Sequence, residues 1–152
     1  MSDSYGRKIA RIGLDIGAIK LNPTDPFLWA SGFRMPIYND NRMFLFHPNN
    51  RKLITNGLYE IAKTLSFSVI AGTSTAGIAP GVLLAEKFDG CPFIYVRDRP
   101  KDHGLRNQIE GIDADKDLSG HNVLLIEDLI STGGSSARAV QAIRDANSTC
   151  NH

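Results

Sequence analysis

The sequence contains few cysteines and almost no net charge, and both absences exclude classes of partner. Its two cysteines, Cys91 and Cys150, stand far apart and lack the spacing that zinc ligands show. We therefore expect free thiols in a reducing compartment, with neither a disulfide nor a zinc ion. The 17 basic residues nearly balance the 16 acidic ones, for a net charge of +1, which argues against nucleic acid or a membrane surface as a partner.

The sequence also lacks long apolar runs, a secretory signal and internal repeats. No stretch approaches the roughly 20 apolar residues that cross a bilayer, so we expect no membrane partner and a cytoplasmic location. A hydrophobic content of 42% with 22% charged residues is ordinary for a soluble globular protein. The length suffices for one core, and we predict a single α/β domain over residues 1–152.

The stretch of residues 122–136, NVLLIEDLISTGGSS, combines an apolar run, an acidic pair and a glycine-rich turn. The run Val123–Ile126 is typical of a strand buried in a parallel sheet, and Glu127 and Asp128 follow it directly. After the turn, apolar residues recur at helical spacing. A glycine turn before a helix N-terminus presents backbone N–H groups and a positive dipole end, which together bind phosphate.

The acidic pair indicates which phosphate ligand fits this unit. Carboxylates repel a bare phosphate, but they accept hydrogen bonds from the hydroxyls of a sugar whose phosphate group lies on residues 131–136. The turn lacks the Gly-Lys-Ser/Thr ending of the nucleoside-triphosphate P-loop. The alternative is an ordinary strand-to-helix connection with a Ser or Thr cap, which predicts no ligand.

A second unit of the same kind lies upstream. Residues 68–71 are predicted to form a buried strand, the small-residue loop GTSTAG follows at residues 72–77, and a helix is predicted over residues 78–88. A further strand is predicted over residues 92–96. Two consecutive strand–helix–strand units imply a parallel sheet with right-handed crossovers.

Before residue 68 the apolar pattern predicts two helices on either side of a small sheet. The predicted elements are a helix over residues 5–19, short strands at residues 27–30 and 36–38, and a helix from residue 48 to about residue 66. Trp29 is expected to pack within the small sheet.

Residues 97–111, RDRPKDHGLRNQIEG, form a polar segment too long for a simple connection between elements. Residues 97–106 hold four fixed cations and two acids, with a histidine besides. One interpretation is a solvated surface loop, which is how most charge clusters turn out. The order Arg-x-x-x-Lys-Asp-His-Gly favours the other interpretation, an active-site lid.

The segment IEDLISTGGSS resembles the ribose-phosphate signature of the type I phosphoribosyltransferases, and RDRPKDHGLRNQIEG resembles the mobile loop of one branch, the orotate phosphoribosyltransferases. The resemblance runs from about residue 21 to residue 146. It implies an α/β fold, a parallel sheet flanked by helices, with a small N-terminal flap over the base at residues 21–47. It also implies a phosphoribosyl pyrophosphate (PRPP) binding core at residues 68–146 and a mobile lid at residues 97–111.

The resemblance implies a reaction as well, in which ribose 5-phosphate passes from PRPP to orotate to give orotidine monophosphate on the pyrimidine route. Lys101, His103 and Arg97 are the implied catalytic residues, which stabilise charge on the leaving pyrophosphate; His103 alternatively donates a proton to it. The Mg²⁺ cofactor is carried by PRPP, near Glu127 and Asp128. Members of the family resemble each other in being dimers, so we expect a homodimer with the lid acting in trans.

The same resemblance implies contact residues for both substrates. The PRPP contacts fall on the two strand-end loops and the lid: Thr73, Ser74, Thr75, Arg97, Lys101, His103, Glu127, Asp128, Leu129, Ile130, Ser131, Thr132, Gly133, Gly134 and Ser135. The orotate contacts fall on the flap and the turn: Phe33, Tyr38, Arg42 and Ser131.

Several positions depart from the family's pattern. Asp98 stands where a lysine is frequent, Ala76 where one branch carries a lysine, and Leu105 with Arg106 where a glycine-rich pair is common; Arg106 is expected to compensate in part for Asp98. The family continues beyond the helix after the phosphate turn, so we expect a C-terminally shortened chain of lower stability, with little core character in residues 147–152. Two alternatives stay open: a phosphoribosyltransferase for another base, and a catalytically weak or inactive sensor that binds PRPP.

Overall fold

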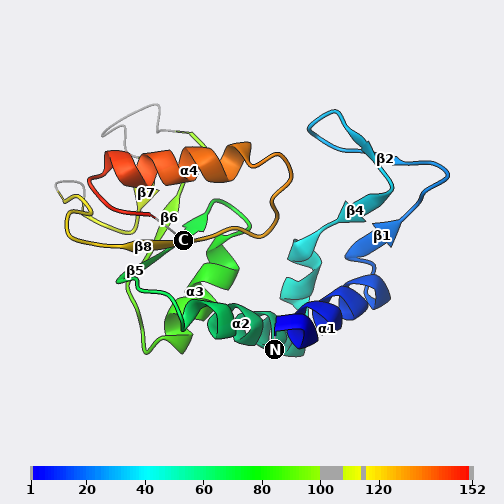
Figure 1. Ribbon diagram of the computed structural model, residues 1–152, viewed down its shortest axis with the longest axis horizontal. Helices are drawn as coiled ribbons and strands as arrows, with labels where there is room; N and C mark the ends of the chain where they lie inside the picture. The colour runs from blue at the N-terminus through cyan, green and yellow to red at the C-terminus, as the bar shows by residue number, and fades with distance from the viewer. Residues whose placement is uncertain (1, 100–107, 114–115, 151–152) are drawn as a thin grey trace. The chain divides into compact units, whose positions relative to one another are not determined.

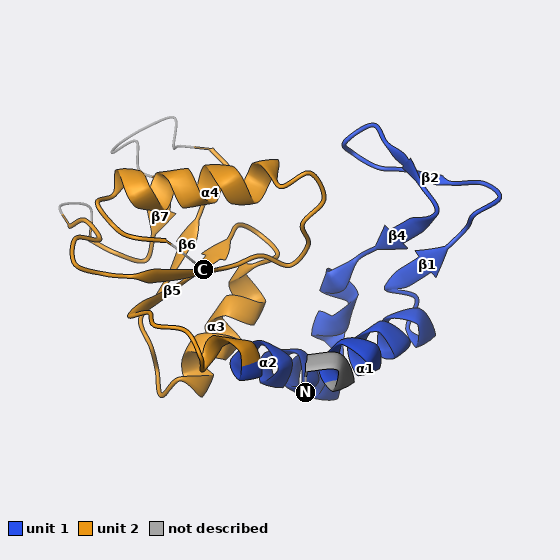
Figure 2. Cartoon of the chain, in the orientation of Figure 1, with its two compact units in different colours: residues 1–60 blue, residues 61–152 orange. Residues whose placement is uncertain are grey.

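The computed structural model of the chain describes residues 2–99, 108–113 and 116–150. The chain divides into two compact units, residues 1–60 and residues 61–152 (Figure 2). Within the described ranges, no helix combines the length and the apolar character that crossing a bilayer requires. The single domain expected over residues 1–152 stays a prediction.

The first unit combines helices with two small antiparallel sheets. Its elements (Figure 1) are α1 (Ser2–Asp15), β1 (Ile19–Leu21), β2 (Phe27–Leu28), β3 (Arg34–Met35), β4 (Ile37–Asn39), the 3₁₀ helix η1 (Asn41–Phe46) and α2 (Pro48–Ala62), which extends just past it. Strand β1 pairs with β4, and β2 pairs with β3. The small sheet expected between two helices is therefore a pair of two-stranded sheets.

Helix α1 ends earlier than the sequence predicted. We expected it to reach residue 19, because Ile16 and Ile19 continue the apolar spacing. Instead it ends at Asp15, and Gly17 adopts a left-handed conformation with φ of 73°, which favours glycine and ends helices. Ile19 begins strand β1 and packs at Gly13, where an added Cβ would lie 2.7 Å from its Cδ1. Ile19 is therefore packed inward, as the apolar spacing predicted, but it belongs to a strand and not to the helix.

Trp29 links the two small sheets. Its indole Nε1 donates a hydrogen bond of 2.8 Å to the carbonyl of Ile37 in β4. Its backbone N–H donates to Phe33 across a turn in which Gly32 has a φ of 85°. Because the half-buried indole has its polar atom satisfied within the unit, Trp29 has the packing role expected from the sequence.

The second unit is a four-stranded sheet with a helix on each face. Its elements are β5 (Val69–Thr73), α3 (Ile78–Lys87), β6 (Phe93–Val96), β7 (Ile109–Glu110), β8 (Val123–Ile126) and α4 (Gly134–Asp145). The strand order is β7–β6–β5–β8, with β5 parallel to both β6 and β8 and β7 antiparallel to β6. The three strands and two helices predicted here are present, and β7 is an additional antiparallel strand.

Helices α3 and α4 cover opposite faces of this sheet (Figure 1). Every residue of the central strand β5 is buried, as a parallel strand covered on both faces requires. Successive strand residues point to opposite faces: Val69 and Ala71 join Ile143 of α4 in one core cluster. Ile70 therefore faces α3, whose Leu84 is also fully buried. Burying each such aliphatic side chain contributes about 2 kcal/mol, and the two layers fix the strand ends that carry the site.

Residues 148–150 pack against the sheet beside β8. The N–H of Val123 donates a hydrogen bond of 2.8 Å to the carbonyl of Thr149, next to a parallel bridge. Ser148 is 9% exposed and Cys150 is 3% exposed. The expectation of little core character was therefore wrong for Ser148 and Cys150, whose small side chains are buried at the sheet edge without the apolar pattern that marks a strand, whereas Thr149 between them is exposed.

Candidate functional site

The loops singled out in the sequence lie at one edge of the second unit's sheet. Strands β6, β5 and β8 are parallel neighbours, so their carboxyl ends meet there. Ser74 follows β5, Arg97 follows β6, and Glu127 follows β8. Ligands of open α/β sheets bind outside this edge, and the described site candidates of this unit are neighbours there.

Three hydrogen bonds hold the carboxylate of Glu127. Its Oε1 accepts from the hydroxyl of Thr73 at 2.6 Å and from the backbone N–H of Asp128 at 3.2 Å, and its Oε2 accepts from the hydroxyl of Ser136 at 3.2 Å. Hydrogen bonds to an ionised acceptor are stronger than neutral ones. The carboxylate therefore joins the end of β5 to the first turn of α4.

The loop after β5 folds tightly onto the strand ends. The N–H of Ser74 donates to the last carbonyl of β6 at 2.8 Å, and the N–H of Gly77 donates to the carbonyl of Thr73 at 3.0 Å. A cis peptide bond joins Ser74 to Thr75. The backbone N–H groups of Thr75 and Ala76 find no acceptor among the residues that the structure describes, and N–H groups without an acceptor suit a bound anion.

The turn between β8 and α4 is accessible to a ligand. Gly133 has a φ of 79° immediately before α4 begins at Gly134, and the first N–H groups of a helix have no partner within the helix. Together with the helix dipole, these groups favour the binding of an anion. The predicted phosphate contacts here are half-buried or exposed: Leu129, Ile130, Ser131, Thr132, Gly133, Gly134 and Ser135.

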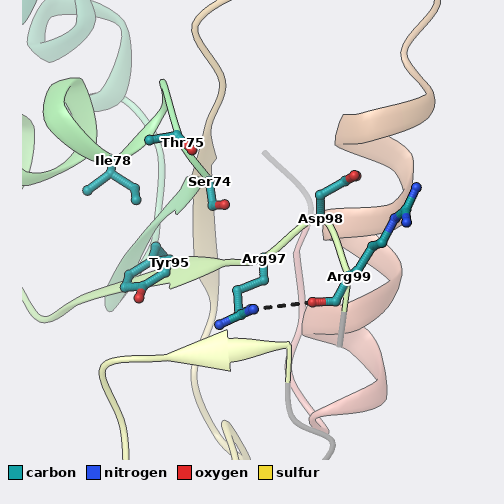
Figure 3. Close-up of a pocket in the computed structure, with 7 residues that line it drawn as sticks. All are labelled: Ser74, Thr75, Ile78, Tyr95, Arg97, Asp98 and Arg99. Atoms are coloured by element: carbon teal, nitrogen blue, oxygen red, sulfur yellow. Dashed lines mark hydrogen bonds between the residues drawn. The ribbon is translucent and has the colours of Figure 1, made fainter. Parts of the chain in front are cut away.

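A pocket of about 440 Å³ lies at the ends of β5 and β6 (Figure 3). Residues of the β5 loop, of α3 and of the end of β6 line it: Ser74, Thr75, Ile78, Tyr95, Arg97, Asp98 and Arg99. Its volume is in the range of small-molecule sites. Two arginines and two small hydroxyls suit a ligand with phosphate groups.

Arg97 is fixed by the strand that closes the predicted lid segment. Its backbone N–H donates to the carbonyl of Gln108 at 2.8 Å, and Gln108 Nε2 donates back to the carbonyl of Arg97 at 3.2 Å. Its guanidinium lies 3.4 Å from Glu110 Oε1 and donates to the carbonyl of Arg99 (Figure 3). The described ends of residues 97–111 are thus anchored on the sheet.

Asp98, at a position where lysine is frequent in the family resembled, forms an ion pair with α4. Arg138 Nη2 lies 2.7 Å from Asp98 Oδ1, with the two side chains 58% and 53% exposed. The hydrogen bond and the positive charge of Arg138 hold the pKa of Asp98 below its ordinary value. An ion pair this exposed adds little stability, but it neutralises the acid beside the pocket. Arg106, the compensating cation expected from the sequence, lies outside the described residues.

Two of the three predicted catalytic residues, Lys101 and His103, also lie outside the described residues. Their roles therefore stay predictions that rest on the sequence. Arg97, the third, lines the pocket and is 40% exposed.

The carboxylates of this edge fit a metal ion that arrives with a substrate. Across residues 2–99, 108–113 and 116–150, no group of three or more His, Cys, Asp or Glu side chains is placed to hold a metal. Glu127 and Asp128 are adjacent, and Glu127 already accepts three hydrogen bonds. Mg²⁺ keeps several waters and binds through one or two carboxylates together with substrate phosphates. The donor set therefore fits Mg²⁺ carried by a phosphorylated ligand.

Three of the four candidates for contact with a base belong to the first unit, and the fourth, Ser131, lies in the exposed turn between β8 and α4. Phe33 is 59% exposed, and Tyr38 packs against Phe27 with ring centroids 5.7 Å apart. Arg42 is bound by both carboxylate oxygens of Asp40, at 2.7 Å and 2.9 Å. This ion pair competes with the predicted role of Arg42, and the contacts of all three side chains with a base stay predictions.

Asp40→Asn is expected to destabilise the chain by up to about 1 kcal/mol near neutral pH, because asparagine still caps η1 but loses the ionic bond to Arg42. Asp40 caps η1 by accepting from the backbone N–H of Arg42 at 3.1 Å, and hydrogen bonds from Arg42 hold its pKa below the ordinary value. A lowered pKa stabilises the fold above the unfolded-state pKa of about 3.9, and this contribution is lost as the pH falls through the folded-state pKa.

Urea unfolding at about pH 7 and about pH 2 measures this difference. The loss in Asp40→Asn should be present at the higher pH and absent at the lower one. Asp25 is exposed and supplies the control, since Asp25→Asn should leave the free energy of unfolding unchanged at both pH values. An equal loss at both pH values would show that the ionised carboxylate is not what stabilises η1.

A profile of the phosphoribosyl transferase domain matches residues 42–151, which include the sheet, both strand-end loops and the acidic pair. The chain belongs to the phosphoribosyltransferase family.

Individual relatives agree with this family. An orotate phosphoribosyltransferase of Streptococcus mutans is 51% identical over 141 residues, covering 91% of this chain and 65% of that protein. An orotate phosphoribosyltransferase of Cytophaga hutchinsonii is 45% identical over 144 residues, covering 93% of this chain and 66% of that protein. The crystal structure of orotate phosphoribosyltransferase from Aeropyrum pernix has a TM-score of 0.77 at 28% identity, covering 93% of this chain and 76% of that one. The chain spans just under two thirds of the curated relatives, and the predicted α/β fold is confirmed.

Sequence reasoning missed three side chains at this sheet edge, Tyr95, Arg99 and Arg138, and it placed Ser136 in the phosphate turn without its bond to Glu127. Tyr95 and Arg99 line the pocket with Arg97, and their alternate spacing was a signal, because every second residue of an extended chain shares a side. Ser136 donates a hydrogen bond to Glu127, and Arg138 forms an ion pair with Asp98. No local pattern marks these two contacts, since Arg138 lies 40 residues from Asp98 and Ser136 lies nine residues from Glu127, across the turn.

Proposed function

We propose that this chain catalyses the transfer of ribose 5-phosphate from PRPP to orotate, giving orotidine monophosphate and pyrophosphate. The observation that carries the proposal is the 51% identity with the Streptococcus mutans orotate phosphoribosyltransferase across 91% of the chain. The geometry supports it, because two anion-binding loops flank an acidic pair at one sheet edge. A sugar that carries phosphate at both ends matches that order of charges.

In this proposal the two loops bind different parts of PRPP. The turn of residues 131–135 and the N-terminus of α4 bind the 5-phosphate through N–H groups and hydroxyls. The loop of Ser74 and Thr75 and the pocket arginines bind the pyrophosphate. Glu127 and Asp128, between the loops, accept hydrogen bonds from the ribose hydroxyls.

The reaction breaks the bond between C1 of ribose and the pyrophosphate oxygen, which leaves with the electron pair. A ring nitrogen of orotate, already anionic, forms the new bond to C1. Positive charge on the ribose ring grows in an oxocarbenium-like transition state, and the neighbouring carboxylates favour it. Lys101, His103 and Arg97 stabilise the charge on the leaving group, to which Mg²⁺ bound with PRPP adds neutralisation. A closed lid keeps water from the cation.

The test is a turnover assay with orotate, PRPP and Mg²⁺, followed as the loss of orotate absorbance. Turnover that requires all three supports the proposal. No turnover by folded protein would overturn it, and calorimetry with PRPP would then distinguish a PRPP-binding sensor from a chain whose loops bind nothing. Turnover with adenine in place of orotate would favour a different base.

Asp128→Asn is expected to weaken PRPP binding about 10- to 100-fold, because a hydrogen bond to a charged acceptor contributes about 1.5–3 kcal/mol. Calorimetric titration with PRPP measures this change. Asp145→Asn removes the same charge at the other end of α4 and should leave the affinity unchanged. Unchanged PRPP affinity in Asp128→Asn would exclude a ribose contact for this carboxylate.

With this function we also propose a homodimer, in which the lid of each subunit acts in the partner's site. We propose a cytoplasmic location as well. The near-neutral charge and the two distant cysteines agree with such a setting. Sedimentation at several protein concentrations tests the dimer, and fractionation of cells tests the location.

A further inference from the structure

We infer that Thr73 is a positioning residue, which acts on the ribose through Glu127 rather than touching PRPP itself. The inference rests on the proposed function for the identity of the ligand and deepens its account of the site. It changes the role expected for Thr73 from its place in the loop after β5, which was a direct contact with the pyrophosphate.

Thr73 has no room for a ligand at its hydroxyl. The residue is 3% exposed, and its Oγ1 lies 2.6 Å from Glu127 Oε1 and 3.4 Å from the carbonyl of Ile126. Gly77 closes the remaining side, since a Cβ added there would come within 2.5 Å of the same Oγ1. A ligand oxygen needs about 2.7–2.8 Å from a hydroxyl, and the neighbouring atoms already occupy that shell.

The hydroxyl of Thr73 determines which lone pairs of Glu127 remain available. A carboxylate has about four acceptor positions. The hydroxyl of Thr73 and the N–H of Asp128 occupy both positions on Oε1, and Ser136 occupies one on Oε2. Among the described residues no further donor reaches Glu127, so it can accept one more hydrogen bond, at Oε2. Glu127 is thereby set to receive a single ribose hydroxyl in a fixed direction.

This arrangement also connects the two anion-binding loops. Thr73 ends β5 and starts the loop proposed for the pyrophosphate, whereas Ser136 lies in the first turn of α4, beside the turn proposed for the 5-phosphate. Both donate to the same carboxylate. Glu127 therefore holds the two loops at a set separation, which positions a sugar that carries phosphate at both ends.

The experiment measures the binding of ribose 5-phosphate and of inorganic pyrophosphate separately by calorimetry. Thr73→Val keeps the shape of the side chain and removes its hydroxyl. It should weaken ribose 5-phosphate about tenfold and leave pyrophosphate unchanged. Thr73→Ser restores the hydroxyl and should restore the affinity to within about twofold. In turnover, Thr73→Val should raise KM for PRPP and leave KM for orotate unchanged.

Two further variants locate the effect. In a Glu127→Ala background, Thr73→Val should cause no additional loss, because the carboxylate that it positions is gone. Ser136→Ala, at a half-buried position, should weaken ribose 5-phosphate in the same sense and keeps the inference testable should Thr73→Val fail to fold. Thr55→Val is the control: it removes another buried hydroxyl, which donates to the Arg51 carbonyl at 2.9 Å within α2, and should change neither affinity.

The outcomes separate this inference from the proposed function. Loss of pyrophosphate binding alone in Thr73→Val would mean a direct contact and would overturn the inference. A full loss in the Glu127→Ala background would overturn it as well. Wild-type chain that binds ribose 5-phosphate but does not use orotate would refute the proposed reaction and leave the positioning role to be decided by the binding data. Wild-type chain that does not bind ribose 5-phosphate would overturn both.

Discussion

Gly77→Ala is expected to lower the free energy of unfolding by about 2–3 kcal/mol and to abolish PRPP binding. A Cβ on Gly77 would lie 2.5 Å from the carbonyl oxygen of Ile126, 2.5 Å from Thr73 Oγ1 and 2.7 Å from the backbone nitrogen of Thr73. Two of these three atoms are backbone atoms of the paired strands β8 and β5, so they cannot move aside as the end of a flexible side chain would. The loop after β5 would have to lift from the sheet, and with it the N–H groups proposed to bind the pyrophosphate.

Urea unfolding followed by circular dichroism gives the stability change, and calorimetry with PRPP gives the binding change. Gly6→Ala is the matched control, because Gly6 lies inside α1 with no atom within 4 Å of the added Cβ. Alanine in a helix interior is favoured over glycine by about 0.5–1 kcal/mol, so this variant should be at least as stable as the wild type. If Gly77→Ala had the stability and the PRPP affinity of the wild type, the loop would have space for a Cβ, and the prediction would be wrong.

The strand–helix units were predictable from the sequence because each carries its own local signal. The runs that became β5, β6 and β8 are short, apolar and followed by turn residues, and such runs form strands wherever two faces are covered. Strand β7 carries no comparable signal. It has two residues, Ile109 and Glu110, and it exists because β6 offers it an antiparallel partner. Pairing of this kind is a tertiary effect that local pattern does not encode.

The first unit shows how one residue overrides a periodic pattern. Ile16 and Ile19 continue the apolar spacing of α1, yet the chain turns at Gly17, where a left-handed backbone costs least. Periodicity indicated correctly that Ile19 is packed inward. It misassigned the element, because strand β1 directs the same side chain toward Gly13.

The candidate site was predictable in its residue types and not in its internal bonds. Glycines, hydroxyls and paired acids at strand ends identify an anion site from sequence. That Thr73 and Ser136 share the carboxylate of Glu127, or that Arg138 neutralises Asp98, depends on residues brought together over long chain separations. These bonds decide which oxygen of Glu127 can still accept a hydrogen bond from a ligand, and that could be argued only from the structure.

Lys101→Ala is expected to reduce kcat by about 100- to 1,000-fold and to leave PRPP binding nearly unchanged, because a donor aimed at developing charge contributes mainly in the transition state. Turnover with saturating orotate and PRPP measures kcat, and calorimetry measures PRPP affinity. Lys116→Ala is the control, since Lys116 forms an exposed ion pair with Asp113 at 2.7 Å and has no place in the proposed site. A parallel loss of PRPP affinity would mean that Lys101 binds the ground state and is not specific to the transition state.

Mixing two defective variants then tests whether the lid acts in trans. The Lys101→Ala and Asp128→Asn variants are mixed and allowed to exchange subunits. The assay uses a PRPP concentration too low for the weakened site of Asp128→Asn to bind PRPP. In a heterodimer, one site pairs the intact Asp128 of one chain with the intact Lys101 of the other, so random exchange should restore about a quarter of wild-type activity. The second site of that heterodimer carries both defects and stays inactive. If the lid acts within its own subunit, every site keeps one defect and mixing restores nothing, because no exchange can bring an intact lid to an intact ribose site.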